Sequence, residues 1–258
     1  MNWDHFIYFA AIALGCWLGA ALWAFWAHKV PSKGVIGLSF AGMGVYAVFL
    51  VGFWITLGRP PLRTMGETRL WYAFFMSLAG LITYTLWEYR WILSFSTMMS
   101  AVFIALNCFK PEIHDQTMMP ALQSFWFIPH VTIYMFSYAL LACTFLLALV
   151  GLFRKKTVVL PAADRLCTAG LAFFTLGMLL GSLWAKEAWG DYWSWDPKET
   201  WAAITWLSYL VYLHLRKRPQ TSQTILYLIL ILSFLFLQMC WYGVNLLPSA
   251  QGSVHNYS

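Results

Sequence analysis

The chain has 258 residues, of which 61% are hydrophobic and only 10% are charged, and its mean hydropathy is +0.65. A soluble domain would carry about 25% charged residues, so the composition excludes an ordinary soluble protein. The formal net charge of +6 does not indicate nucleic-acid binding, because the bases fall between hydrophobic runs and not on one soluble face. The pattern predicts an all-α polytopic membrane protein.

Eight apolar runs can be drawn as membrane-spanning helices, in chain order. They cover residues 6–27, 35–57, 70–87, 91–107, 130–153, 166–185, 199–215 and 224–246. The third and fourth are joined only by Glu88-Tyr89-Arg90, which predicts a tight helical hairpin. No linker long enough to separate domains interrupts the series, so residues 1–258 are predicted to form a single integral-membrane domain.

The charges in alternate loops predict how these helices are oriented. One side receives ten bases and two acids, a net +8, whereas the other receives six bases and eight acids, a net −2. Because basic loops stay in the cytoplasm, we expect the first side to be cytoplasmic. Both termini would then be extracytoplasmic, as would the segment between the sixth and seventh helices.

Residues 184–206, WAKEAWGDYWSWDPKETWAAITW, hold six of the sixteen tryptophans. We call them the Trp-rich segment. Gly190 and Pro197 interrupt it, so its middle is not expected to be one continuous helix. Tryptophan favours the boundary between membrane and water, so an aromatic belt is one interpretation. The density of rings and the acids between them favour the alternative, a binding surface for a flat apolar ligand with polar edges.

This segment closely resembles the tryptophan-rich WWD signature of haem-handling membrane proteins in cytochrome c maturation. Its Asp-Pro-Lys-Glu-Thr at 196–200 and the Tyr-Leu-His at 212–214 are similar to the CcsA (ResC) family of the System II pathway. The resemblance continues at 58–73, 120–131 and 254–257, so it covers most of the chain after Gly58. It implies the haem-delivering subunit of a membrane cytochrome c synthase, or haem lyase.

In the reaction that the resemblance implies, two thiols of a CxxCH motif in apocytochrome c add across the vinyl groups of haem b. The protein would grip the iron and leave the vinyl edge open, so catalysis would be mostly proximity and orientation, and no catalytic residue is assigned. The implied partners are haem, apocytochrome c, a CcsB (ResB)-like membrane subunit and, indirectly, thiol-reducing proteins. The implied location is the cytoplasmic (inner) membrane of a bacterium, with the active face outside.

His130 and His255 flank the Trp-rich segment and share its predicted side of the membrane. Imidazole is a common axial ligand of haem iron, although either histidine alone could equally be an ordinary interfacial residue. The family has its external ligand pair at matching positions, so the resemblance implies that these two histidines ligate the iron. The further haem contacts that we expect are Trp189, Trp193, Trp195, Asp196 and Trp201.

His214 closes the seventh predicted helix, just before a basic run. A histidine is favoured at a helix C-terminus by the helix dipole, and that alone could explain it. An ionisable residue at membrane depth is also a candidate functional residue. The resemblance implies a transmembrane haem ligand, whose companion histidine belongs to the partner subunit. His114 lies in a loop between two acids, and we expect it to be solvated.

Several charged residues have two interpretations. Asp196 and Glu199 could orient a histidine, or they could cap the helix that begins at Pro197, which is the simpler role. The bases that could neutralise haem propionates are Lys186, Lys198, Arg59 and Arg63. Lipid headgroups are an equally good explanation for the two arginines.

Two other functions stay open. A CcmC-like protein would pass haem to a chaperone and form no thioether, but that family departs from this chain at Pro197-Lys198-Glu199-Thr200. A haem exporter or a b-type electron carrier would perform no catalysis. An electron-carrying haem is usually held between paired embedded histidines, and no second one clearly pairs with His214.

Overall fold

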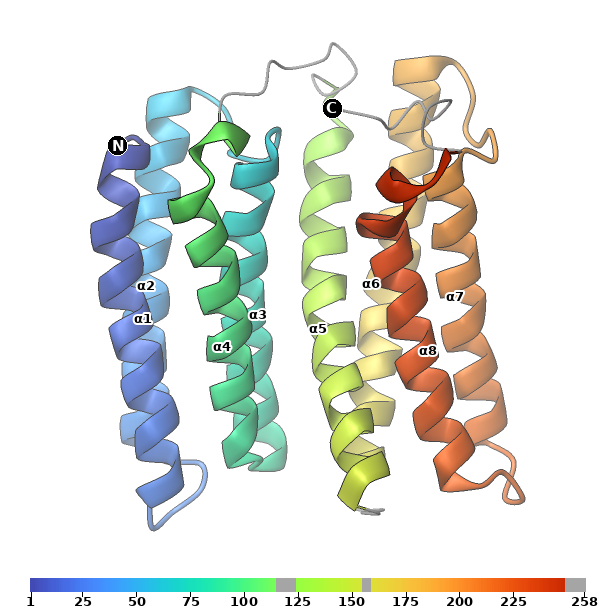
Figure 1. Ribbon diagram of the computed structural model, residues 1–258, viewed down its shortest axis with the longest axis horizontal. Coiled ribbons are helices and arrows are strands. Elements are labelled where there is room, and N and C mark those ends of the chain that lie inside the picture. Colours follow the sequence, from blue (N-terminus) through green and yellow to red (C-terminus); the bar gives the residue numbers. More distant parts are fainter. Residues whose placement is uncertain (115–123, 155–158, 249–258) are drawn as a thin grey trace. The chain divides into compact units, whose positions relative to one another are not determined.

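The computed structural model describes residues 1–114, 124–154 and 159–248 (Figure 1). This part of the chain is helical and contains no strand. The long helices are α1 (Trp3–Trp26), α2 (Lys33–Leu57), α3 (Met65–Trp87), α4 (Arg90–Phe109), α5 (Phe127–Arg154), α6 (Leu160–Trp189), α7 (Pro197–Arg216) and α8 (Gln223–Trp241). Two short 3-10 helices are η1 (Pro111–Ile113) and η4 (Gly243–Leu246). Each of the eight predicted spans is a helix, so the all-α prediction is confirmed.

The helices group into two compact units. Unit 1, Met1–Met118, holds α1 to α4, and unit 2, Met119–Ser258, holds α5 to α8. The single domain expected from the sequence stays a prediction.

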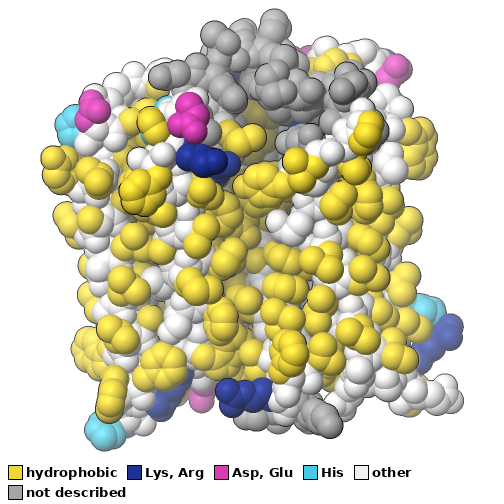
Figure 2. Space-filling model, in the orientation of Figure 1, with side chains coloured by type: hydrophobic (Ala, Val, Ile, Leu, Met, Phe, Trp, Pro, Cys, Tyr) yellow, Lys and Arg dark blue, Asp and Glu magenta, His cyan; other side chains and the backbone are white. Residues whose placement is uncertain are grey.

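The surface of the helices matches a lipid environment. Seven of the described helices are long and apolar enough to cross a membrane, and α7, whose first turn carries Lys198 and Glu199, is the long helix that is not among them. Large apolar side chains are exposed along them, such as Trp26 at 82% and Ile55 at 74%. Figure 2 shows hydrophobic side chains over most of the visible described surface. Such a surface would be costly in water and is stable against hydrocarbon, so this is a multi-pass membrane protein.

In unit 1, α3 and α4 form the predicted tight hairpin. Glu88 ends α3 in the left-handed conformation, with φ 60°, and α4 begins two residues later. The helices approach closely because Gly80 has no side chain: a Cβ there would lie 2.1 Å from Ser96 Oγ. Farther along, the Ser100 hydroxyl donates to the Ala73 carbonyl at 2.8 Å. The hairpin is therefore held by small and hydroxylated residues that bring two backbones together.

In unit 2, α5 packs along a stripe of glycines on α6. A Cβ on Gly170 would lie 2.8 Å from Leu141, and one on Gly181 would lie 2.6 Å from His130, so neither position has room for a side chain. The Ser137 hydroxyl also donates to the Gly170 carbonyl, at 2.7 Å. The stripe consists of Gly170, Gly177 and Gly181. It brings the beginning of α5 against the last three turns of α6.

The helices differ in their bounds from the predicted spans, and the ends of α6 and α8 show the reason. α6 was expected over 166–185 and is longer at both ends, because Pro161 suits a first helical turn and the left-handed Gly190, with φ 93°, ends the helix. It therefore takes in the first six residues of the Trp-rich segment. The last helix was expected to reach residue 246, but α8 ends at Trp241 and a 3-10 turn follows.

Candidate functional site

The Trp-rich segment consists of a helix end, a short loop and a helix start. The first part belongs to α6, and the last part begins α7 at Pro197. Only residues 190–196 lie between the two helices. The predicted interruption at Gly190 and Pro197 is therefore confirmed, but the stretch outside the helices is shorter than the whole segment.

Two acids hold the loop onto α7. The buried Asp196 carboxylate accepts from the Lys198 amide at 2.9 Å, and together with Glu199 it forms a capping box. Glu199 Oε2 also accepts from the amides of Ser194, at 2.8 Å, and Asp196, at 3.2 Å. Both side chains therefore have the capping role, and Glu199 additionally fixes the path of the loop.

Three tryptophans of the segment pack against the helices. Trp184 is only 2% exposed, and the Trp189 ring meets it edge-on, with centroids 4.8 Å apart. Trp206 on α7 donates from its indole nitrogen to Thr175 Oγ1 on α6, at 2.9 Å. These rings therefore pack between helices. The sequence alone did not show whether these tryptophans have a packing role or bind a ligand.

The loop tryptophans are placed differently. Trp195 is 69% exposed and has the left-handed φ of 59°, and its ring meets that of Trp193 edge-on, with centroids 5.7 Å apart. The Trp193 indole N–H is buried and meets no acceptor among the described residues. The Lys186 ammonium donates a hydrogen bond to the Gly190 carbonyl and lies 5.3 Å from the centre of the Tyr192 ring. The loop thus presents an exposed ring and one buried donor.

His130, in the first turn of α5, is held in a defined orientation against α6. Its Nδ1 donates to the Gly177 carbonyl at 2.8 Å. The ring stacks on Trp184, with centroids 5.5 Å apart and an interplanar angle of 30°, and Tyr134 meets it edge-on at 4.7 Å. Because a carbonyl can only accept, Nδ1 of the neutral imidazole carries the proton and Nε2 carries the lone pair that can ligate a metal.

The start of α5 is also fastened to the Trp-rich segment. The Ser124 hydroxyl donates to Glu187 Oε2 at 2.7 Å, and the rings of Phe127 and Trp184 pack with centroids 4.9 Å apart. The fold therefore brings His130 directly to Trp184, although the two lie more than fifty positions apart in the sequence.

His214 has a different setting. It is exposed on α7, and its Nε2 accepts from the Arg218 guanidinium at 3.0 Å. Val211 and Leu207, one and two turns before it, are exposed as well. This face is therefore apolar before His214 and carries the charged Arg218 after it. His255, the other predicted external ligand, lies outside the described residues.

Of the two arginines of unit 1 that could bind propionates, Arg59 is paired with an acid. Arg59 forms a forked ion pair with the buried Glu67, with N–O distances of 2.9 and 2.8 Å. Glu67 also completes a capping box with Thr64 at the start of α3. Burial lowers the pKa of Arg63, the neighbouring charge of Arg59 lowers it further, and Glu67 opposes the shift. Arg59 and Glu67 thus have a structural role at this loop.

His114 was expected to be solvated, and this prediction is wrong. Its ring stacks on Trp3, with centroids 3.6 Å apart and an interplanar angle of 2°. A Cβ on Gly66 would lie 2.9 Å from the same ring, so His114 packs between α1 and the start of α3. The contact depends on how distant parts of unit 1 meet, which the loop sequence does not indicate.

The sequence matches a known protein family described as Cytochrome C assembly protein, whose model covers residues 64–250, well over half of the chain. The chain belongs to this family. Relatives named "Cytochrome c biogenesis protein CcsA" include those of Cuscuta exaltata and Atropa belladonna. The first is 34% identical over 238 residues, 76% of this chain and 77% of the relative. The second is 34% identical over 265 residues, which cover 85% of this chain and 83% of the relative.

The similarity to CcsA proteins of the System II pathway predicted from the sequence is therefore confirmed, and the protein has a role in cytochrome c maturation. The match to the cytochrome c assembly family begins at Thr64, the N-cap of α3, so α1 and α2 precede it. Sequence reasoning missed the residues that hold His130, above all Gly177 and Gly181. Their signal was available, because the glycines of the stripe on α6 are seven and four residues apart and so share one helix face.

Proposed function

We propose that this chain is the haem-delivering subunit of a membrane cytochrome c synthase. It carries haem b, as cargo and substrate, to the extracytoplasmic face of the membrane and presents its vinyl groups to the CxxCH motif of apocytochrome c. The observation that supports this most is the setting of His130, which is oriented by the Gly177 carbonyl and stacked on Trp184 of the Trp-rich segment.

His130 has the features of a prepared axial ligand. A hydrogen bond from the other ring nitrogen to a backbone carbonyl is the usual way in which a metal-binding histidine is oriented. The ring also loses little further freedom on binding, because Trp184 and Tyr134 already confine it. We propose His255, which lies outside the described residues, as the second axial ligand.

The loop at 190–196 would supply the surface for the macrocycle. The exposed Trp195 offers an apolar face, and the buried Trp193 N–H offers a donor for a propionate carboxylate. Trp189 and Trp201 flank this loop on the two helices. Asp196 contributes as the cap that fixes the loop to α7.

His214 is our proposed ligand for haem at membrane depth, shared with a CcsB (ResB)-like subunit. Its support is the exposure of the imidazole on a face that otherwise carries Leu207 and Val211. A polar ring turned toward hydrocarbon is unfavourable, and a partner helix that brings a second histidine and a haem would remove that cost.

The chain's part in thioether formation is positional. Each thiol of apocytochrome c adds across one vinyl group, so that sulfur bonds to one carbon and the hydrogen goes to the other, and no oxidant is consumed. The thiols must stay reduced, which is the role we assign to thiol-reducing proteins. His130 and the Trp193–Trp195 loop hold the cargo in register, in a bacterial cytoplasmic membrane, and proximity supplies most of the rate.

The test is co-expression of this chain and an apocytochrome c, with and without a CcsB-like partner, followed by measurement of covalently bound haem. Holocytochrome should form only with the partner. A chain that instead delivers haem to a soluble chaperone and leaves the apocytochrome unmodified would show the CcmC-like alternative.

His130→Gly gives the residue-level test in the same cells. Changes to the residues that orient a metal ligand commonly cost about 10–100-fold in activity, so loss of the ligand itself should lower the yield at least as much. Added imidazole can enter the gap and should restore part of the yield and of the low-spin spectrum. His28→Gly is the matched control, because His28 is exposed and belongs to no motif. An unchanged spectrum and yield in His130→Gly would disprove the ligand assignment.

A further inference from the structure

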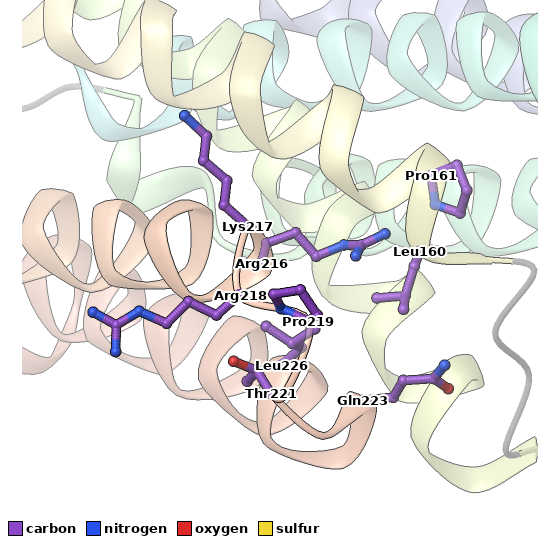
Figure 3. A pocket seen from close by; sticks show the side chains of 9 residues that line it. All are labelled: Leu160, Pro161, Arg216, Lys217, Arg218, Pro219, Thr221, Gln223 and Leu226. Atoms are coloured by element: carbon purple, nitrogen blue, oxygen red, sulfur yellow. The ribbon is translucent and has the colours of Figure 1, made fainter.

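A cavity of about 440 Å³ lies in unit 2 where α7 ends and where α6 and α8 begin (Figure 3). Its volume is within the range of small-molecule sites. It belongs to the end of α6 remote from His130, so it is separate from the site described above. The residues that give it chemical character are Leu160, Arg216, Lys217, Arg218, Gln223 and Leu226.

Arg216 is fixed in place at the wall of this cavity. Its Nε donates to both carboxylate oxygens of Asp164, at 3.1 and 3.0 Å, and the Tyr212 hydroxyl donates to the same carboxylate at 2.6 Å. The two terminal nitrogens of the guanidinium donate to no acceptor among the described residues. Figure 3 shows the Arg216 side chain extending from α7 toward Pro161 of α6. A prepared guanidinium fork of this kind suits an oxyanion.

The rest of the lining adds positive potential on one side and apolar surface on the other. Lys217 and Arg218 also line the cavity, and Figure 3 shows that their side chains extend away from Arg216, so they add positive charge around it. Gln223 is the first residue of α8, where the helix dipole is positive. Leu160 and Leu226 are both buried and line the cavity with hydrocarbon. The cavity thus joins an anion-binding edge to an apolar floor.

We propose that this cavity binds the headgroup phosphate of an acidic phospholipid. The cavity lies at the ends of α6 and α8, both candidate membrane spans, which puts it at the depth of the headgroups. Ile225 and Leu228 are exposed in the first turns of α8, so an acyl chain can lie along that helix. Basic pockets between transmembrane helices recognise anionic headgroups in this way. A free phosphate would use the basic edge and leave the apolar floor unused.

The experiment is native mass spectrometry of the purified full chain in detergent with added phosphatidylglycerol or phosphatidylcholine. The chain should retain phosphatidylglycerol preferentially. Gln223→Leu removes an amide donor from the cavity and should weaken phosphatidylglycerol binding by about ten-fold, as expected for one hydrogen bond to a charged group. Gln220→Leu is the matched control, because Gln220 is exposed in the loop just before α8 and does not line the cavity.

A second pair of variants tests charge. Lys217→Gln with Arg218→Gln should abolish the preference for phosphatidylglycerol, whereas Lys29→Gln with Lys33→Gln, which removes two exposed charges of unit 1, should preserve it. Equal retention of the two lipids would overturn the proposal, and so would equal effects of the two double variants. Inorganic phosphate that displaces phosphatidylglycerol at equal concentration would show that a free anion is the ligand. These readouts need no cytochrome c synthesis, so they succeed or fail independently of the proposed function.

Discussion

The two ends of unit 2 each carry a histidine, but the histidines are held very differently. His130 packs between α5 and α6, with its Nδ1 on the Gly177 carbonyl and its ring on Trp184. His214 is exposed near the end of α7, where its Nε2 accepts a hydrogen bond from the Arg218 guanidinium. One imidazole is prepared within the chain, whereas the other faces outward from it.

This difference teaches how the two histidines that we propose as ligands can have different requirements. A preorganised ligand loses little entropy when it binds, so its geometry can be read from a single subunit. An exposed ligand on an apolar helix face gains its environment only from another molecule. We therefore expect changes near His130 to act within the isolated chain, and changes at His214 to act only in the complex with a partner.

The largest effect is expected in a test of topology, which asks on which side of the membrane each of the two ends of unit 2 lies. Single cysteines at Ser194, in the 190–196 loop, and at Gln220, in the loop after α7, would be introduced into a chain without its natural cysteines. Both positions are exposed, so labelling depends on sidedness alone. An impermeant thiol reagent should label Ser194→Cys and not Gln220→Cys in intact cells. The reverse pattern would refute the topology.

The next largest effect should come from Gly181→Ala. The new methyl group would lie 2.6 Å from His130 Cε1 and 2.8 Å from its Nδ1, so the ring must leave its position. The yield of covalent cytochrome c should fall by about 10–100-fold, as for other losses of ligand orientation. Gly44→Ala is the control, because nothing lies within 4 Å of a Cβ at that helical position. Equal yields from the two variants would mean that the orientation of His130 is unimportant.

His214→Gly should have a smaller effect that depends on the partner. With a CcsB-like subunit present, the haem that co-purifies should decrease several-fold, because one transmembrane ligand is lost. The thermal stability of the chain alone should change by less than about 0.5 kcal/mol beyond the helix propensity of glycine, since the residue is exposed. Haem content measured by pyridine haemochrome and unfolding measured in parallel would separate the two contributions. A full haem content would contradict the assignment.

The smallest effect should come from Glu199→Ala in the capping box of α7. The loss of the bonds to Ser194 and Asp196 should cost about 1 kcal/mol of stability, the usual value of a helix cap. Because the loop carries Trp193 and Trp195, the cytochrome yield should decrease modestly as well. Glu112→Ala is a suitable control, since Glu112 is an exposed acid in η1 of unit 1. A variant with parent stability would show that the cap does not hold the loop.

Much of the fold could be predicted from the sequence, because each helix is a long apolar run and the bilayer imposes its length. The ends were less predictable where polar residues continue a helix. Lys186 and Glu187 suggested a loop, yet α6 continues through them until Gly190. Hydropathy identifies the apolar part of a helix, whereas capping residues and glycines identify the residue at which the helix ends.

The candidate site was predictable only in part. The Trp-rich segment and His130 are visible in the sequence, and the fold brings His130 to Trp184. The bond to the Gly177 carbonyl was not predictable, because it depends on the register between α5 and α6, which distant residues determine. The stacking of His114 on Trp3 could not be foreseen for the same reason.

Trp195 has a consequence for the balance between stability and activity. An indole in the left-handed region costs about 1 kcal/mol, and this one is largely exposed, so the loop would be more stable with glycine there. A chain selected for stability alone would lose that ring. Trp195→Gly should therefore raise the melting temperature while it lowers the yield of holocytochrome, and the size of that exchange would measure what the fold gives up to keep an aromatic surface open to its cargo.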